Sequence, residues 1–222
     1  MIGALVPAKA LDQAKTRLAA LLSEDERRRL ALAMLEDVVG TLRSVPRITT
    51  TAVVSPDFDV LERAADLGSE SIVEPETARG INEALSFARD VMSRHGLNAL
   101  LVVLADVPAM TAGDIDAVLD AVPRGRGIAI CPSSSGGTSA LALRPPNVMP
   151  FCFGANSCDA HTEEASAHEL ATTVLHIDSL NRDIDEPEDL YHLLYHPAET
   201  ATHRLLTEIH LNERLPVNRS CA

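Results

Sequence analysis

Both lysines of the chain lie in one short basic stretch near its start. Lys9 and Lys15 follow the apolar run 2–6, and Arg17 comes two residues after Lys15. The remaining seventeen of the 19 Lys and Arg residues are arginines. A lysine ammonium is a compact, mobile point charge, whereas a guanidinium is a planar fork. Since α/β proteins often hold phosphate in the loop after a first buried strand, we predict phosphate binding here.

A second group of candidate residues is acidic. Asp106 ends the most apolar run of the chain, where a carboxylate is costly to desolvate without a partner. Asp183 and Asp185 stand two apart in a segment predicted to be extended, so both point to the same side. Together the three carboxylates would form a hard oxygen site for Mg²⁺. Alternatively, Asp106 is a helix N-cap or a loop residue whose carboxylate accepts hydrogen bonds from backbone amides. The same Asp-x-Asp spacing at 57–59 and 114–116 is typical of helix starts.

Two short glycine-containing segments are candidates for binding anions. Gly136-Gly137-Thr138 either forms a plain turn between strands or offers backbone N–H groups and a hydroxyl to an anion. Gly154 stands three residues before Ser157, which is predicted to cap a helix. The free amides at that helix start are also suited to receiving an anion.

A third helix start and the histidines complete the candidate residues. Gly80 precedes Asn82, which is predicted either to cap the helix or to hydrogen-bond the edge of a nucleobase. None of the eight histidines stands beside a serine or cysteine in a nucleophile elbow, so we assign them to packing or to the surface. Among them only His161 is near a suspected anion site.

Alternating strands and helices must position these residues. Ser23 and Glu26 have the spacing of a capping box, so a helix is predicted to begin there. We predict strands at 2–6, 49–54, 70–73, 99–104, 127–131, 139–143 and 173–176. Further helices are predicted at 59–67, 81–94 and 158–169, from residue 111 and from residue 187. The alternation predicts an α/β fold with a doubly wound, mostly parallel sheet, and the short gap before 139–143 predicts an antiparallel excursion.

Composition limits the classes of function. With 222 residues, 46% of them hydrophobic, the chain is expected to form one main domain at 1–194, followed by a helical arm or tail at 195–222 for packing or dimerisation. The net charge of -13 argues against nucleic-acid binding. No apolar run is long enough to span a membrane and the start lacks a signal peptide's basic flank, so we expect a cytoplasmic protein.

The candidate residues fall into a series of short motifs. These are Val6-Pro7-x-Lys9 with Ala14-Lys15-x-Arg17-Leu18, Gly80-Ile81-Asn82-x-Ala84, Asp106-Val107-Pro108, Gly136-Gly137-Thr138, Phe153-Gly154-x-x-Ser157 with His161, and Asp183-Ile184-Asp185-x-Pro187-x-Asp189-Leu190. From residue 2 to about 194, their order and spacing resemble the 2-phospho-L-lactate or phosphoenolpyruvate guanylyltransferases of coenzyme F420 biosynthesis. The resemblance implies a Rossmann-like, glycosyltransferase-A type nucleotidyltransferase fold.

The resemblance also implies a reaction and a set of roles. The enzyme would transfer GMP from GTP to a small phosphorylated carboxylic acid and release pyrophosphate. The implied roles are triphosphate binding for Lys9, Lys15 and Arg17, base binding for Gly80 and Asn82, Mg²⁺ binding for Asp106, Asp183 and Asp185, and acceptor binding for Thr138, Gly154 and Ser157. Lys9, Lys15 and Asp106 would be the catalytic residues.

Two alternative functions stay open on the sequence alone. One is a related nucleotidyltransferase with another acceptor, such as 3-phosphoglycerate, a molybdopterin or a sugar phosphate. The glycine-rich first loop common in those enzymes is replaced here by Pro7-Ala8-Lys9, which counts against them. The other is a non-catalytic nucleotide-binding regulatory domain, which would not need Asp106, Asp183 and Asp185 together.

Overall fold

A seven-stranded sheet forms the centre of the described residues, 1–195 and 200–214, in this computed structural model. Its strands are β1 (Ile2–Pro7), β2 (Ile48–Ser55), β3 (Glu70–Val73), β4 (Ala99–Val103), β5 (Gly127–Pro132), β6 (Thr138–Arg144) and β7 (Ala171–Val174). Their order is β3-β2-β1-β4-β6-β5-β7, and within the described sheet β6 alone runs antiparallel to its neighbours. The predicted parallel sheet and its antiparallel excursion are therefore confirmed.

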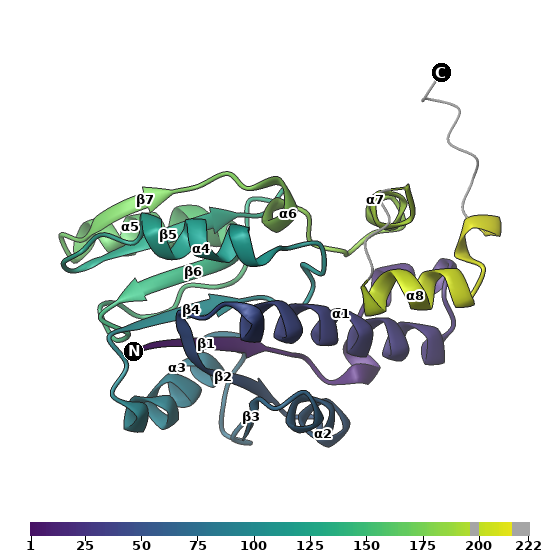
Figure 1. Ribbon diagram of the computed structural model, residues 1–222, viewed down its shortest axis with the longest axis horizontal. Coiled ribbons are helices and arrows are strands. Elements are labelled where there is room, and N and C mark those ends of the chain that lie inside the picture. The colour runs from purple at the N-terminus through teal and green to yellow at the C-terminus, as the bar shows by residue number, and fades with distance from the viewer. Residues whose placement is uncertain (196–199, 215–222) are drawn as a thin grey trace.

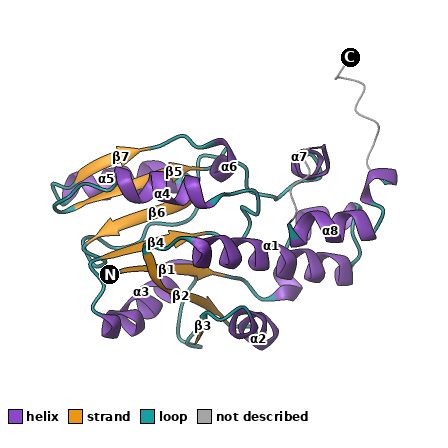
Figure 2. Ribbon diagram, viewed as in Figure 1, coloured by secondary structure: helices purple, strands orange, loops and turns teal. Residues whose placement is uncertain are grey.

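Helices cover both faces of the sheet, as Figures 1 and 2 show. The α-helices are α1 (Glu24–Ser44), α2 (Phe58–Asp66), α3 (Ile81–Met92), α4 (Ala112–Ala121), α5 (Ser157–Ala167), α6 (Asp178–Asn181), α7 (Asp189–Tyr195) and α8 (Ala201–Glu208). Short 3₁₀ helices are η1 (Leu11–Gln13), η2 (Thr16–Ala20), η3 (Ser93–His95) and η4 (Leu211–Glu213). One face of the sheet packs against α1, α2 and α4, and the other against α3 and α5.

The two central strands divide their side chains between these two cores. In β1, Ala4 and Val6 belong to the core under α1, whereas Leu5 belongs to the core under α3. In β4, Leu101 and Leu100 alternate in the same way. This alternation follows from the two-residue period of a strand, and it explains why buried parallel strands are apolar throughout.

Local capping fixes where several helices begin. Ser23 and Glu26 form the predicted capping box of α1: the Ser23 hydroxyl accepts the Glu26 amide and the Glu26 carboxylate accepts the Ser23 amide. Asp57 caps α2 by accepting the Asp59 amide, and Asp114 completes a capping box at α4. These findings confirm the interpretation of the 57–59 and 114–116 acids as helix starts.

The last strand lies two residues earlier than predicted. We predict 173–176 from the apolar pattern, but β7 is Ala171–Val174. It pairs in parallel with β5, from Gly127 opposite Ala171 to Ile130 opposite Val174. The register of its partner, rather than its own apolar residues, therefore determines where this edge strand begins and ends.

The described part of the C-terminal segment packs on α1 rather than on the sheet. Leu205, Leu206 and Leu211 join the N-terminal half of α1 in a separate apolar cluster. The Asp37 carboxylate of α1 accepts the Ala201 and Thr202 amides at the start of α8, at 2.6 and 2.9 Å. The predicted dimerisation role stays a prediction, and residues 196–199 and 215–222 of the predicted arm lie outside the described residues.

In the parts of the chain that the structure describes, the longest helix is amphipathic and no helix is apolar enough over a sufficient length to cross a membrane.

Candidate functional site

The candidate site lies where the strand order reverses. β1 pairs with β2 on one side and with β4 on the other. The chain continues from β1 to β2 on one side of this pair, and from β4 to β5 on the other. Such a switch point, at the carboxyl ends of parallel strands, is where open α/β sheets bind ligands. The basic segment 8–23 follows β1, and Asp106 follows β4.

Lys15 joins these two loops. Its Nζ lies 2.9 Å from Asp106 Oδ2 and 3.0 Å from Asp185 Oδ1. The Lys15 side chain is 8% exposed, against 23% for Asp106 and 45% for Asp185. Lys15 also adopts a left-handed backbone, φ 51° and ψ 39°, which is uncommon for a residue with a Cβ. The ammonium is therefore buried between two carboxylates that still reach solvent.

Backbone contacts bring the Asp183 to Asp185 segment to Asp106. The Ile184 amide donates to the Asp106 carbonyl oxygen at 3.0 Å, and the Ile184 side chain is buried in the cluster under α8. The Asp189 carboxylate accepts the amides of Asp185 and Glu186, at 2.9 and 2.7 Å. Asp189, the first residue of α7, therefore fixes the turn that presents Asp185.

The ionisable groups of this cluster influence one another. Burial alone would lower the pKa of Lys15, but the charges of Asp106 and Asp185 outweigh it and raise that pKa. Burial alone would raise the pKa of Asp185, but Lys15, Arg17 and Lys9 hold it below its usual value. Asp183 differs: burial, and then repulsion by Asp106, raise its pKa.

The three aspartates suit a divalent cation in chemistry, although they do not form a closed set of ligands. Asp106 Oδ1 is buried and has no hydrogen-bond partner, so this oxygen has an unused lone pair. Among the described residues, no three His, Cys, Asp or Glu side chains stand close enough together to hold a metal. The Lys15 ammonium occupies the space between two of the predicted ligands. A hard cation would therefore have to displace it.

The other two basic residues of the loop are more exposed. Lys9 is exposed, and it acts on Asp185 through its charge. Arg17 is 68% exposed, and its Nη1 lies 3.6 Å from Glu186 Oε1. Two exposed cations and one buried ammonium thus lie along one edge of the sheet, an arrangement able to neutralise a polyphosphate.

The predicted acceptor residues form a second cluster at the same edge. Because β6 is antiparallel to β4, the start of β6 at Thr138 lies beside the end of β4, and Leu104 N–H donates to the Ser139 carbonyl. Thr138 Oγ1 lies 3.2 Å from Ser157 Oγ and 3.1 Å from His161 Nδ1. All three side chains are at most 2% exposed.

The loop between β6 and α5 connects this cluster to the start of α3. The Asn82 side chain accepts the Phe153 amide at 2.8 Å and donates to the Phe153 carbonyl at 2.9 Å. Gly80 and Gly154 have φ values of 89° and 146°, and a Cβ on either would meet no atom within 4 Å. Both glycines therefore border open space where a ligand can approach the backbone.

The prediction that Ser157 caps a helix is wrong, and so is the first of the two alternatives given for Asn82. Asn156, with φ 53°, occupies the cap position of α5, so Ser157 is the first helical residue and its hydroxyl turns to Thr138. Asn82 does not cap α3, because Gly80 holds that position and the Asn82 amide pairs with the loop. In both cases the side chain binds a partner far away in the sequence instead of the amides of its own helix.

The turn before β6 also differs from an open anion-binding loop. The Gly136 amide donates to the Ser133 carbonyl at 3.1 Å, and the Gly137 amide donates to Ser133 Oγ at 3.1 Å. Since these amides are paired within the turn, the plain turn interpretation is correct for 136–137, and Thr138 contributes a hydroxyl.

Two residues beyond the predicted set hold the site together. His161 lies four residues after Ser157, and Asp189 lies four residues after Asp185. On a helix a spacing of four places side chains on one face, so the position of His161 relative to Ser157 was a usable signal. The contacts of the His161 ring nitrogens with Thr138 and the loop depend on the tertiary structure.

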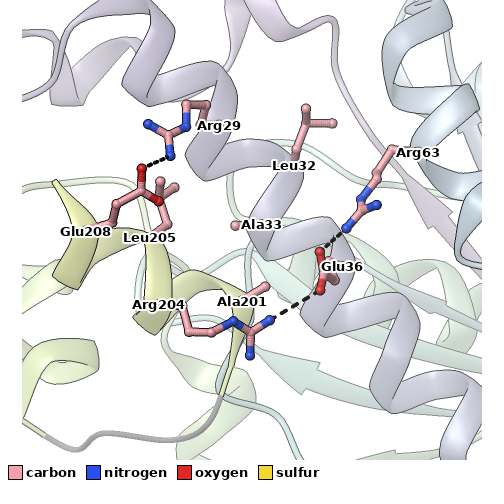
Figure 3. A pocket seen from close by; sticks show the side chains of 9 residues that line it. All are labelled: Arg29, Leu32, Ala33, Glu36, Arg63, Ala201, Arg204, Leu205 and Glu208. Atoms are coloured by element: carbon pink, nitrogen blue, oxygen red, sulfur yellow. Dashed lines mark hydrogen bonds and ion pairs between the residues drawn. The ribbon is translucent and has the colours of Figure 1, made fainter.

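The groove in Figure 3 is a separate feature between α1 and α8. Its volume is about 400 Å³, and it is lined by Arg29, Arg63 and Arg204 together with two glutamates. Each arginine pairs with one of those glutamates, as the dashed lines in Figure 3 show for the residues drawn. The charges of the three arginines are therefore largely compensated by the two glutamates. We interpret the groove as the polar rim of the contact between α1 and α8.

The matching family model and two similar proteins all carry the name of a guanylyltransferase. A family model described as "Guanylyl transferase CofC like" matches residues 2–219. The phosphoenolpyruvate guanylyltransferase of Sphaerobacter thermophilus is 43% identical over 194 residues, 87% of this chain and 92% of that protein. The 2-phospho-L-lactate guanylyltransferase of Methanothermobacter thermautotrophicus is 35% identical over 225 residues, 98% of each chain.

Solved structures share the fold at lower identity. A protein of Desulfovibrio desulfuricans G20, assigned as a nucleotide-diphospho-sugar transferase, superposes with a TM-score of 0.77 at 18% identity, covering 96% of this chain and 97% of that one. A nucleotidyl transferase of Methanothermobacter superposes with a TM-score of 0.63 at 15% identity, covering 88% and 97%. The fold is therefore the glycosyltransferase-A type nucleotidyltransferase fold predicted above.

Proposed function

The chain belongs to the CofC-like guanylyl transferase family, and on this basis we propose that it transfers GMP from GTP to a three-carbon phospho-acid. The acceptor is phosphoenolpyruvate or 2-phospho-L-lactate, the two acids named for its relatives. The reaction releases pyrophosphate, depends on Mg²⁺ and serves coenzyme F420 biosynthesis.

The observation that carries the proposal is the Lys15 bridge at the switch point. Lys15 is held between Asp106 and Asp185, and its ammonium would be free to bind a triphosphate if those carboxylates held a divalent cation. Asp106, Asp183 and Asp185 would hold the cation, and Asp106 Oδ1 has the unpaired buried oxygen such a role requires. When bound, the cation would supply charge neutralisation for the triphosphate and the departing pyrophosphate.

The residues of this chain would act by position and charge. Lys9, Lys15 and Arg17 would bind the triphosphate, and Gly80 with Asn82 would border the base. An acceptor phosphate oxygen, already ionised at pH 7, attacks the α-phosphorus of GTP. The new bond joins that oxygen to the α-phosphorus, and the bond to the bridging oxygen of pyrophosphate breaks.

This chemistry needs no general base, which agrees with the state of the histidine nearest the acceptor residues. Burial lowers the pKa of His161, and this effect is larger than the opposite effect of the hydrogen bond to the Ser157 carbonyl. The resulting pKa is about 4. His161 Nε2 also accepts the Cys152 amide at 2.9 Å, so this nitrogen is not available to a substrate proton. Thr138, Gly154 and Ser157 would receive the phosphate or carboxylate of the acceptor.

The test is pyrophosphate release in Mg²⁺ buffer, with four nucleoside triphosphates crossed with phosphoenolpyruvate, 2-phospho-L-lactate and 3-phosphoglycerate. We expect release with GTP and one of the first two acids. Asp106→Ala, or Asp183→Ala with Asp185→Ala, should abolish release in folded protein. Turnover with 3-phosphoglycerate alone would favour another acceptor route. Nucleotide binding without release under all conditions would favour a regulatory domain.

A further inference from the structure

The buried side chains at the acceptor cluster form a defined hydrogen-bond network. Thr138 Oγ1 lies 3.2 Å from Ser157 Oγ, and His161 Nδ1 lies 3.1 Å from Thr138 Oγ1. His161 Nε2 accepts the backbone N–H of Cys152 at 2.9 Å. The His161 ring also meets the Phe153 ring edge-on, with centroids 4.8 Å apart and planes at 78°. The imidazole is thus held at both nitrogens and by an aromatic neighbour.

The Cys152 amide determines the tautomer of His161. A backbone N–H can only donate, so Nε2 must carry a lone pair. A neutral imidazole with a bare Nε2 carries its hydrogen on Nδ1. That nitrogen therefore carries a hydrogen and cannot accept one from the Thr138 hydroxyl. Its hydrogen is shared between the Thr138 hydroxyl oxygen, 3.1 Å away, and the Ser157 carbonyl.

A count of hydrogens shows what this tautomer does to the hydroxyl pair. Thr138 and Ser157 carry one hydroxyl hydrogen each, and the hydrogen bond between the two residues takes up one of these hydrogens. Because His161 Nδ1 cannot accept from Thr138 Oγ1, the second hydrogen has no acceptor within the trio. In the opposite tautomer, protonated at Nε2, Nδ1 would accept a hydrogen bond from this second hydroxyl. The structure shows no other partner for either hydroxyl among the described residues.

We propose that His161 is a positioning residue that makes the Thr138–Ser157 hydroxyl pair a net hydrogen-bond donor, so that this subsite selects a fully ionised acceptor oxygen of a phosphate or carboxylate. The inference rests on the proposed function, since it deepens the recognition of the acceptor. An ionised oxygen can only accept, and it satisfies the surplus donor. A protonated or esterified group would satisfy it less well, because bonds to charged acceptors are stronger.

Two substitutions separate the two ring nitrogens. In His161→Asn the side-chain amide can reach the position of Nδ1 and keep a donor to Thr138. In His161→Gln the amide oxygen can reach the position of Nε2 and keep the acceptor for the Cys152 amide. We expect His161→Gln to raise the KM for the acceptor about tenfold, the loss of roughly one hydrogen bond to a charged group. His161→Asn should raise that KM at most about threefold, and the KM for GTP should stay within about twofold in both.

The hydroxyls supply the matched control. Thr138→Val should behave like His161→Gln, and the double variant should lose little more, because both changes remove one function. Thr138→Ser keeps the hydroxyl and should stay close to wild type. The methyl ester of the acceptor carboxylate distinguishes the two anionic groups: if the carboxylate is the partner, the ester binds wild type poorly but is not weakened further by His161→Gln. Equal rises in the KM values for GTP and acceptor would mean a merely structural role.

The tautomer can be measured without turnover, which separates this inference from the proposed function. In protein labelled with ¹⁵N-histidine, the long-range ¹H–¹⁵N pattern of His161 should be that of a neutral imidazole protonated at Nδ1 from pH 5 to 8. A pattern protonated at Nε2, or a doubly protonated ring at pH 6, would overturn it. Absence of pyrophosphate release with a correct tautomer would refute the function and the acceptor role but leave the network intact.

Discussion

Replacing Lys15 with methionine keeps the length of the side chain but removes the ammonium that lies between Asp106 and Asp185. The Lys15 side chain is 8% exposed, so the pairing is buried on the lysine side. The carboxylates are 23% and 45% exposed, so water can solvate them when the lysine is gone. Removing one partner of a fully buried pair costs about 3–5 kcal/mol, whereas exposed pairs contribute about 0.2–1 kcal/mol.

The expected cost of Lys15→Met falls between these limits, at about 2 kcal/mol. For a chain of this size, that loss lowers Tm by roughly 4–8 °C. A double-mutant cycle with Asp106→Asn should give a coupling energy of about 1 kcal/mol, because the second pair, with Asp185, survives in the Asp106 variant. Lys9→Met is the matched control, since Lys9 is exposed and should change Tm little.

Magnesium provides a second readout on the same variants. In the wild-type protein a divalent cation at Asp106 and Asp185 would compete with the Lys15 ammonium, whereas in Lys15→Met these carboxylates have lost that ion pair. Thermal shift measured against MgCl₂ should therefore show half-saturation at about tenfold lower Mg²⁺ in Lys15→Met than in wild type or Lys9→Met. An unchanged Tm together with identical Mg²⁺ curves would refute the account of Lys15 as the ion that holds the two carboxylates together.

Two further predictions concern aspartates. Burial and repulsion by Asp106 raise the pKa of Asp183 above 3.8, so its charged form is disfavoured in the folded state. Asp183→Asn should therefore stabilise the protein at pH 7 by about 0.5 kcal/mol. In denaturant unfolding, this gain in stability should disappear once the pH falls below the pKa of an aspartate in the unfolded chain. Asp57→Ala removes the cap of α2 and the 2.8 Å acceptor for the Leu11 amide, and should cost about 2 kcal/mol in urea unfolding. The neighbouring Asp59→Ala, which loses one exposed ion pair, should cost under about 0.5 kcal/mol, and equal losses would contradict the dual role of Asp57.

Much of the sheet could be predicted because its signals are local. The run at 99–104 is apolar throughout, as a strand buried on both faces must be, and β4 lies there. The Ser23 and Glu26 capping box is also local, since the two residues are three apart. Where the governing partner is distant, prediction failed: β7 took its register from β5, and Ser157 turned its hydroxyl to Thr138 instead of capping α5.

The candidate site shows the same division. The sequence by itself determined which residue types stand after the strands. Two lysines follow β1, one aspartate follows β4, and Asp183 and Asp185 follow β7. Only the tertiary structure decided that Lys15 meets Asp106 and Asp185, which lie 91 and 170 positions away. It also decided that a backbone amide of Cys152 sets the tautomer of His161. The physical reason is that strand order brings these groups to one edge of the sheet, and no pattern within a short segment encodes strand order.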